Sequence, residues 1–157
     1  MNTVPLVSIV CTTYNHERYI RQALDGFIMQ KCNFPIEIIV HDDASTDGTS
    51  KIILEYAKKY SIINSILQTE NQWSKGIATW KYLFTDVAKG KYIAICEGDD
   101  YWIDPLKLQK QVDFLEANSN YGLVLTDINI FHQKNQRTEN AIFQNKKIPL
   151  YTSFEEH

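Results

Sequence analysis

The chain has 157 residues, a length that suits about one domain. Hydrophobic residues make up 44% of the sequence and charged residues 22%, which excludes a chain that is disordered throughout. Sixteen basic against nineteen acidic side chains give a net charge of −3, so the chain lacks the basic excess of a nucleic-acid-binding surface and we expect no nucleic-acid partner.

Short β-rich runs alternate with amphipathic segments along the first half of the chain. Apolar residues at helical spacing indicate helices, and β-rich runs bounded by turn residues indicate strands. On this basis the sequence predicts strands at 6–12, 37–41 and 65–68 and a helix at 19–28. A second helix is expected after the polar turn 42–48, with an apolar face made by Ile52, Ile53, Tyr56, Ala57 and Tyr60.

The same alternation continues in the second half. A fourth strand is predicted at 92–96, and Asp104 with Pro105 is typical of a helix cap and first turn. That helix is expected to bury Leu108, Val112 and Leu115. Before the fourth strand, a helix ended by Gly90 is expected to pack through Ile77, Trp80, Phe84 and Val87.

The last part of the pattern sets the fold class. Residues 122–131 predict a fifth strand, and the polar run 133–147 predicts a loop or extended arm. Strands that alternate with helices are typical of an α/β fold with a mainly parallel sheet. In such sheets ligands bind beyond the carboxyl ends of the strands, and the polar clusters of this chain lie there.

The N-terminus and the cysteines indicate a compartment. No basic segment precedes an apolar one, and no apolar run approaches the roughly 18 residues of a membrane span. Cys11, Cys32 and Cys96 lack metal-ligand spacing, and Cys11 and Cys96 lie inside apolar runs. We therefore expect a soluble cytoplasmic chain with buried thiols. Peripheral association of the full-length protein with the inner face of the membrane is compatible with this expectation.

An acidic turn follows the fourth predicted strand. Glu97, Asp99 and Asp100 place three carboxylates within four residues, which repel one another unless a cation or strong donors compensate. Mg²⁺ or Mn²⁺ accepts one or two carboxylates and completes its shell with water and phosphate oxygens. The alternative is a solvated turn that caps the next helix. The aromatic residues Tyr101 and Trp102 directly after the turn favour a site.

Two further clusters follow the second and first strands. Asp43 could accept hydrogen bonds from a nucleobase or a ribose, or belong to a capped turn with its neighbours 45–47. Tyr14 could stack on a base, or pack at the edge of the sheet beside Asn15 as a helix cap. Lys75 could contact a diphosphate, or it could be an ordinary surface lysine. The sequence has neither the glycine-rich motif of dinucleotide-binding folds nor a P-loop, which disfavours both of those nucleotide-binding folds.

Taken in order, the segments VSIVCTTYN, EIIVHDDASTDGT and KYIAICEGDDYWIDPLKLQKQ resemble the family 2 glycosyltransferases of GT-A fold. The resemblance covers residues 6–131 and rests on three separate strand ends. It implies a Rossmann-like, mixed and mainly parallel sheet with flanking helices. It also implies an enzyme that moves a sugar from a nucleotide-diphospho-sugar to an acceptor hydroxyl, with inversion, in polysaccharide or glycoconjugate synthesis.

The resemblance further implies roles for single residues. Thr12 and Tyr14 would border the base, with Tyr14 stacking on it, and Asn15 belongs to the same nucleotide-binding segment. Asp43 would accept from a base imide, which favours a UDP-sugar as the donor. Thr12 stands where many members have proline, and Trp80 where many have asparagine.

The acidic turn receives the remaining roles. Asp99 would contact the ribose or the sugar, and Asp100 would ligate Mn²⁺ or Mg²⁺ on the diphosphate. The general base of the family lies in a second, acceptor-binding half, and none of the later carboxylates matches its motif: Asp127, Glu139, Glu155 and Glu156. We therefore expect a donor-binding domain at 1–131, a polar arm at 132–157, and a base beyond His157. The acceptor would be a saccharide or a lipid-linked molecule.

Two other functions compete with this interpretation. A non-catalytic module that binds nucleotide-sugars would share every donor-site feature and lack only the transfer. A phosphate-accepting receiver domain needs its acidic pair after the first strand and an aspartate after the third. Here those strands end in Thr12–Asn15 and in Gln68 and Thr69, so the placement excludes a receiver.

Overall fold

The computed structural model describes residues 4–145 of the chain. These residues form two compact units that divide after Phe114, within the fourth helix. The first unit contains a four-stranded sheet with its helices, and the second contains a small antiparallel hairpin. Within residues 4–145, no helix combines the length and the apolar character that crossing a membrane requires.

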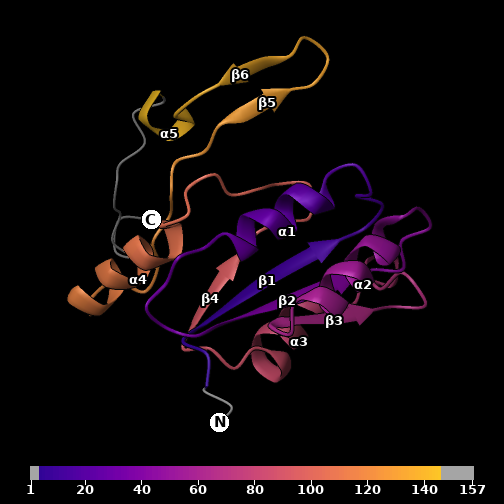
Figure 1. Cartoon of the computed structure of the whole chain (residues 1–157), viewed down its shortest axis with the longest axis horizontal. Helices are drawn as coiled ribbons and strands as arrows, with labels where there is room; N and C mark the ends of the chain where they lie inside the picture. The colour runs from indigo at the N-terminus through magenta and orange to yellow at the C-terminus, as the bar shows by residue number, and fades with distance from the viewer. Residues whose placement is uncertain (1–3, 146–157) are drawn as a thin grey trace. The chain divides into compact units, whose positions relative to one another are not determined.

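The sheet of the first unit is parallel throughout, in the order β3-β2-β1-β4. Its strands are β1 (Val7–Thr13), β2 (Ile36–Asp42), β3 (Ile63–Leu67) and β4 (Tyr92–Ile95). Val7 pairs with Ile36 on one side and with Tyr92 on the other, so β1 lies at the centre. The four predicted strands and the α/β class are confirmed, and the carboxyl ends of β1, β2 and β3 lie at one edge (Figure 1).

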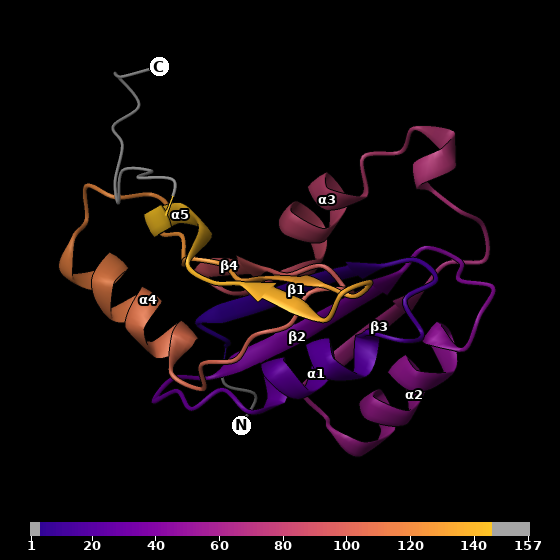
Figure 2. The same cartoon turned by 90° about the horizontal axis from the view of Figure 1, so that it is seen from above.

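Two helices, α1 (Ile20–Ile28) and α2 (Thr49–Lys59), cover one face of this sheet (Figure 2). The apolar side chains of α1 recur every three or four residues, so they form one stripe, which packs against alternate residues of β1 and β2. Burial of each large side chain in this core contributes about 1.5–3 kcal/mol. The core includes Val7, Ile9, Cys11, Leu24, Phe27, Ile38, Val40 and Ile53.

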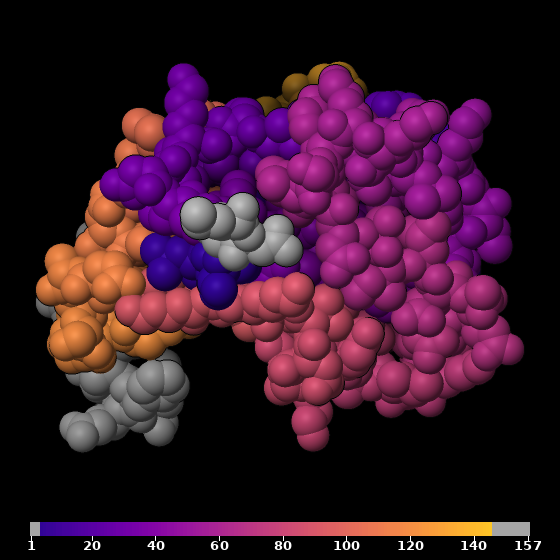
Figure 3. All heavy atoms as spheres, turned by 60° about the horizontal axis from the view of Figure 1, so that its bottom comes forward, coloured from indigo at the N-terminus to yellow at the C-terminus, as the bar shows by residue number. Residues whose placement is uncertain are grey.

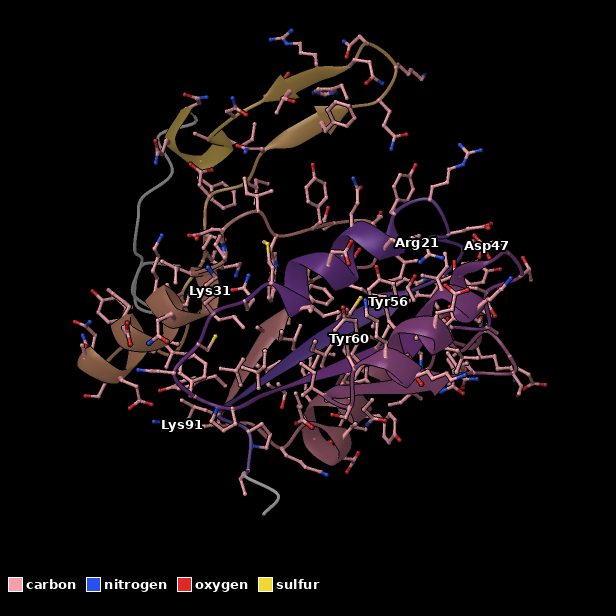
Figure 4. The ribbon with its side chains drawn as sticks, in the orientation of Figure 1. Arg21, Lys31, Asp47, Tyr56, Tyr60 and Lys91 are labelled. Atoms are coloured by element: carbon pink, nitrogen blue, oxygen red, sulfur yellow. The ribbon has the colours of Figure 1, made fainter. Side chains whose placement is uncertain are left out.

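Polar contacts fix α1 against α2 above that core. Arg21 forms an ion pair with Glu55 at 2.8 Å, and the hydroxyl of Tyr56 donates to Asp25 at 2.8 Å. Arg21 also lies over the Tyr56 ring, 6.0 Å from its centre (Figure 4). These contacts are exposed and each contributes little to stability, but together they hold the two helices in register.

The opposite face carries a smaller cluster. Val10 and Ile39 of the sheet pack against Leu83, which begins a π-helical turn, η2 (Leu83–Val87), after the short helix α3 (Thr79–Tyr82). This helical segment projects as a ridge in the space-filling view (Figure 3). The expected helix is therefore present but shorter and partly π-helical, and Ile77 lies before it and is exposed.

Helix α4 (Lys107–Ala117) follows the acidic turn and packs into the main core through Leu108 and Val112. Asp104 accepts from the backbone N–H of Leu106 at 2.9 Å and so caps the turn that opens α4, as predicted. Gln30 ties α4 to the end of α1, since it accepts from the backbone N–H of Leu108 at 3.1 Å. These contacts fix where the chain goes after the acidic turn.

Two expectations for the second unit are wrong. Residues 122–129 form no strand, and only β5 (Ile130–His132) is extended, paired antiparallel with β6 (Arg137–Glu139). The apolar run at 122–131 mimics a strand, but its Leu125 is 71% exposed and finds no ladder partner among the described residues. The polar run 133–147, predicted as a loop or extended arm, contains the turn and second strand of the hairpin and then α5 (Ile142–Asn145), so part of it is regular structure. Residues 146 and 147 of that run lie outside the described residues.

The thiols behave as predicted. Cys11 and Cys96 are buried and free, and Cys32 is half-buried and free. Burial raises the pKa of Cys96 to about 12, so this thiol stays protonated and unreactive at neutral pH.

His41 on β2 gives the fold a predicted pH dependence. Its ring is buried, Nε2 lies 3.1 Å from the side-chain nitrogen of Gln68, and Nδ1 has no hydrogen-bond partner among the described residues. Burial lowers the pKa of His41 below its usual 6.5, although Asp43 and Asp42 oppose this effect. His41 therefore binds a proton more readily in the unfolded chain than in the folded chain. As a result, the free energy of unfolding falls as pH drops below about 6.5.

Urea unfolding at pH 7.5 and 5.5 tests this expectation. We expect wild type to lose up to about 1.4 kcal/mol per pH unit more than His41→Leu over this window. His132→Leu, which removes an exposed histidine of the hairpin by the same substitution, is the matched control. Equal pH dependence of wild type and His41→Leu would contradict the prediction.

Candidate functional site

The loops after β1, β2 and β4 meet at the carboxyl edge of the sheet. The backbone N–H of Asp43 donates to the carbonyl of Thr13 at 2.9 Å, and that of Gly98 donates to the carbonyl of Thr12 at 2.9 Å. The end of β1 therefore binds the start of both other loops. This contact brings the three sequence clusters into one place, because the central strand lies between the two that carry acidic residues.

The loops after β1 and β2 lock each other. Asn15 Oδ1 accepts from the backbone N–H of Thr46 at 2.8 Å, and the backbone N–H of Asn15 donates to Ser45 Oγ at 2.8 Å. Asn15 and Ala44 both adopt positive φ, 56° and 63°, so each loop turns sharply at this contact. The carbonyl oxygen of the Asn15 side chain is thus committed to the scaffold, and its amide group remains for other partners.

Asp47 closes the same region and anchors the start of α2 (Figure 4). Its Oδ1 accepts from the backbone N–H of Thr49 at 2.9 Å and from the Thr49 hydroxyl at 2.5 Å, and its Oδ2 accepts from the backbone N–H of Glu17 at 3.1 Å. This carboxylate joins the first loop to the second helix. Of the two interpretations of the cluster after β2, a ligand contact or a capped turn, the capped turn therefore describes Asp47.

The two adjacent aspartates after β2 differ in their surroundings. Asp42 is buried and accepts from the backbone N–H of Ser45 at 3.2 Å and from Ser50 Oγ at 2.6 Å. The hydrogen bonds of its carboxylate all go to the turn before α2 and to the first turn of that helix, so it shapes the scaffold. Asp43 instead faces the loop that follows β3.

Asp43 holds that loop with both carboxylate oxygens. Oδ1 accepts from the backbone N–H of Gln72 at 2.7 Å, and Oδ2 accepts from that of Trp73 at 3.0 Å. The side chain is only 8% exposed, and Asn71 adds a bond to the Asp43 carbonyl at 3.1 Å. Each oxygen retains a free lone pair. Asp43 can therefore still accept a bond from a ligand while it fixes the 3₁₀ turn η1 (Trp73–Lys75).

The remaining predicted nucleotide contacts lie on this edge or beside it. Thr12 is half-buried near the end of β1, and Tyr14 is 44% exposed directly after it, free to present its ring to a ligand. Lys75 is exposed and pairs with Glu70 of the same loop, so a diphosphate would have to compete with that carboxylate.

The acidic turn carries an unbalanced charge. The backbone N–H of Asp100 donates to the carbonyl of Glu97 at 3.1 Å, which closes the turn. Burial and the neighbouring charge of Asp99 raise the pKa of Asp100, and His16 opposes this rise. A bound cation would remove this electrostatic cost.

The residues fit one kind of metal site. No three His, Cys, Asp or Glu side chains converge as a cage anywhere in residues 4–145. Two adjacent carboxylates suit Mg²⁺ or Mn²⁺ that takes the rest of its shell from water and phosphate. The donor set therefore fits an ion shared with a bound diphosphate rather than a closed protein site.

His16 also belongs to this site, although no motif in the sequence pointed to it. In the structure its Nδ1 lies 3.9 Å from Asp99 Oδ1, so the loop after β1 reaches the acidic turn directly. The available signal was its position in the first post-strand loop, one residue after Asn15.

No later carboxylate among the described residues is placed as a base. Asp127 accepts from the backbone N–H of Phe143 at 2.8 Å and so caps α5, and Glu139 lies 3.3 Å from His132 across the hairpin. Both belong to the second unit and serve its local structure. Glu155 and Glu156 lie outside the described residues.

The sequence and the fold match known proteins. The model of the family described as "Glycosyl transferase family 2" matches residues 8–156. An uncharacterized protein of Mycobacterium tuberculosis, Rv1520, is 45% identical over 81% of this chain and 36% of its own length. The Escherichia coli UDP-Glc:α-D-GlcNAc-diphosphoundecaprenol β-1,3-glucosyltransferase WfaP is 35% identical over 71% of this chain and 42% of its own length.

Two solved structures share the fold. TarS 1–349 of Staphylococcus aureus, in complex with UDP, superposes with a TM-score of 0.60 at 28% identity, over 72% of this chain and 32% of its own. The mannosyltransferase PcManGT of Pyrobaculum calidifontis, in complex with GDP-Man and Mn²⁺, superposes with a TM-score of 0.66 at 26% identity, over 81% of this chain and 37% of its own. The chain thus spans less than half the length of these relatives.

Proposed function

Since the chain belongs to glycosyltransferase family 2 and has the GT-A fold, we propose that it binds a nucleotide-diphospho-sugar, with a UDP-sugar favoured, for transfer to an acceptor hydroxyl. One observation carries this proposal: the end of β1 is hydrogen-bonded to the loops after both β2 and β4 at the carboxyl edge of the sheet. That edge is where α/β sheets bind their ligands. Residues 1–131 are proposed as the donor-binding part, followed by an arm toward an acceptor-binding part.

Each loop contributes a different contact in this proposal. Tyr14 stacks on the base, with Thr12 and Asn15 beside it. Asp43 accepts from the imide N–H of uracil with the lone pairs that the η1 backbone leaves free. Asp99 accepts from hydroxyls of the ribose or the sugar. Lys75 approaches the diphosphate once it leaves Glu70.

Asp100, with Asp99 beside it, would hold Mn²⁺ or Mg²⁺. The complex of the P. calidifontis relative with GDP-Man and Mn²⁺ supports this assignment. A divalent ion bound there supplies a Lewis acid for the negative charge that grows on the departing diphosphate. The raised pKa of Asp100 means that ionisation of this carboxyl costs free energy in the folded chain, and a bound cation would offset that cost.

The proposed transfer inverts the anomeric centre and needs a base for the acceptor hydroxyl. We assign that base to none of the described residues, because the later carboxylates cap α5 or pair within the hairpin. The E. coli relative acts on a lipid-linked acceptor by its name, which supports a saccharide or lipid-linked acceptor in polysaccharide synthesis here. We propose the cytoplasm as the compartment, since the buried Cys11 and Cys96 are free thiols.

Calorimetric titration of UDP, GDP and dTDP into the chain, with Mn²⁺ and then with EDTA, tests the proposal. We expect metal-dependent binding of UDP in preference to the other two. Absence of binding to all three by the folded chain would contradict it. Binding without acceptor-dependent transfer by the full-length protein would instead favour a non-catalytic nucleotide-sugar-binding module.

Tyr14→Ala measures the stacking contact. We expect UDP binding to weaken by about 1–3 kcal/mol, because one base–aromatic contact is lost while the exposed position tolerates a small side chain. Tyr14→Phe should retain most of the affinity, and Tyr82→Ala, which removes a tyrosine of similar exposure on α3, should leave it unchanged. Unchanged affinity in Tyr14→Ala would contradict the stacking role.

A further inference from the structure

Two buried polar atoms at the carboxyl edge have no hydrogen-bond partner among the described residues: Thr13 Oγ1 and His16 Nδ1. Thr13 is only 3% exposed. Such atoms are uncommon in folded proteins, because a polar atom that is buried without a partner loses its hydrogen bonds to water and gains none in return. Both lie against the acidic turn, so the cost arises within the proposed donor site.

Gly98 brings these atoms and the turn together. A Cβ at Gly98 would lie 2.7 Å from Thr13 Oγ1 and 3.0 Å from His16 Nδ1, closer than packed atoms approach. A residue with a side chain at 98 would therefore push the turn away from both. The next residue, Asp99, has its Oδ1 3.9 Å from His16 Nδ1. This distance is too long for a hydrogen bond and short enough to become one by a side-chain rotation.

We infer that His16 is a positioning residue of the donor site, which donates its Nδ1–H to Asp99 when a nucleotide-sugar binds and so holds that carboxylate toward the ribose or sugar hydroxyls. This inference rests on the proposed function. The neutral tautomer with the proton on Nδ1 suffices, because the other partner is a carboxylate. The bond would give the unpaired Nδ1 of His16 a partner and would fix the Asp99 side chain, which is otherwise exposed.

The backbone around His16 supports the role. Its carbonyl accepts from the backbone N–H groups of Tyr19 and Ile20, both at 2.9 Å, at the start of α1. The imidazole therefore extends from an anchored turn rather than from a free loop. A side chain held in this way loses little further entropy when it bonds to Asp99.

A double-mutant cycle in UDP binding with Mn²⁺ tests the inference, on wild type, His16→Ala, Asp99→Ala and the double variant. Alanine is used at position 99 because an asparagine oxygen could still accept from the Nδ1–H of His16. We expect His16→Ala to weaken binding about tenfold in wild type and less than about twofold in the Asp99→Ala background. A histidine that only packs would cost the same factor in both backgrounds, and that result would overturn the inference. His132→Ala removes a comparable histidine–carboxylate pair and should change nothing.

Two conservative variants resolve which nitrogen acts and guard against loss of folding in His16→Ala. Asparagine places an N–H where histidine has Nδ1, whereas glutamine reaches the position of Nε2. We expect His16→Asn to bind UDP within about twofold of wild type and His16→Gln to bind as weakly as His16→Ala. Equal affinities of the Asn and Gln variants would overturn the assignment to Nδ1. A folded wild type that binds none of UDP, GDP and dTDP would overturn the proposed function and this inference with it.

Discussion

Asp100→Asn is expected to abolish the Mn²⁺-dependent part of UDP binding and to leave the fold intact. The substitution keeps the shape of the side chain and removes the charge that the proposed metal site requires. The pKa of Asp100 is raised by burial and by Asp99, so removal of its charge relieves repulsion, and the variant should be at least as stable as wild type. Calorimetry with Mn²⁺ and with EDTA, together with thermal unfolding, measures both effects.

Asp113→Asn provides the matched control, because it removes the same charge from an exposed position of α4. Its UDP affinity should equal that of wild type with and without the metal. A folded Asp100→Asn variant whose affinity still rises on addition of Mn²⁺ would sink the metal role. Loss of affinity that is equal with and without metal would instead make Asp100 a direct ligand of the nucleotide.

Asp43→Ala is expected to lose UDP binding and to release the loop between β3 and α3. Its two oxygens accept from the backbone N–H groups of Gln72 and Trp73, and hydrogen bonds to a charged group are worth about 1.5–3 kcal/mol each. We therefore expect a loss of roughly 3–6 kcal/mol in the free energy of unfolding. Hydrogen exchange at the Gln72 and Trp73 amides would report the release of the loop directly.

Two variants separate the roles of Asp43. Asp43→Asn can accept from one loop amide with its single carbonyl oxygen but presents an N–H to the base imide, so stability should be lost in part and UDP affinity severely. Glu70→Gln, which breaks the exposed pair with Lys75 in the same loop, should leave the free energy of unfolding close to that of wild type. If Asp43→Asn kept wild-type affinity for UDP, the base-reading role would be wrong.

The strands of the main sheet could be predicted because their signal is local. β1 and β2 are apolar runs bounded by turn residues, and the stripe on α1 repeats every three or four residues. The segment 122–129 carries the same local signal, yet it forms no strand in the structure. A strand needs a ladder partner, and no local pattern shows whether the fold offers one, so the exposed Leu123 and Leu125 looked like strand residues.

The candidate site also has features that the sequence predicts and features that it does not. Three acidic or aromatic strand ends could be located from sequence order, because parallel strands bring their carboxyl ends to one edge. The hydrogen-bond partners of these residues could not be predicted from the sequence. Asp42 and Asp43 are neighbours of the same type, yet one bonds within the α2 turn and the other holds a loop some thirty residues away in sequence.

By itself the sequence determined the α/β class, the four strands of the main sheet and the residues that gather at its edge, since these depend on residue type and spacing. Only the tertiary structure decided which of those residues are already engaged. Asn15 is bonded to Thr46, Asp43 to the η1 backbone, and His16 lies against Asp99. Hydrogen-bond partners between loops depend on how distant segments pack, and side-chain periodicity carries no information about that packing.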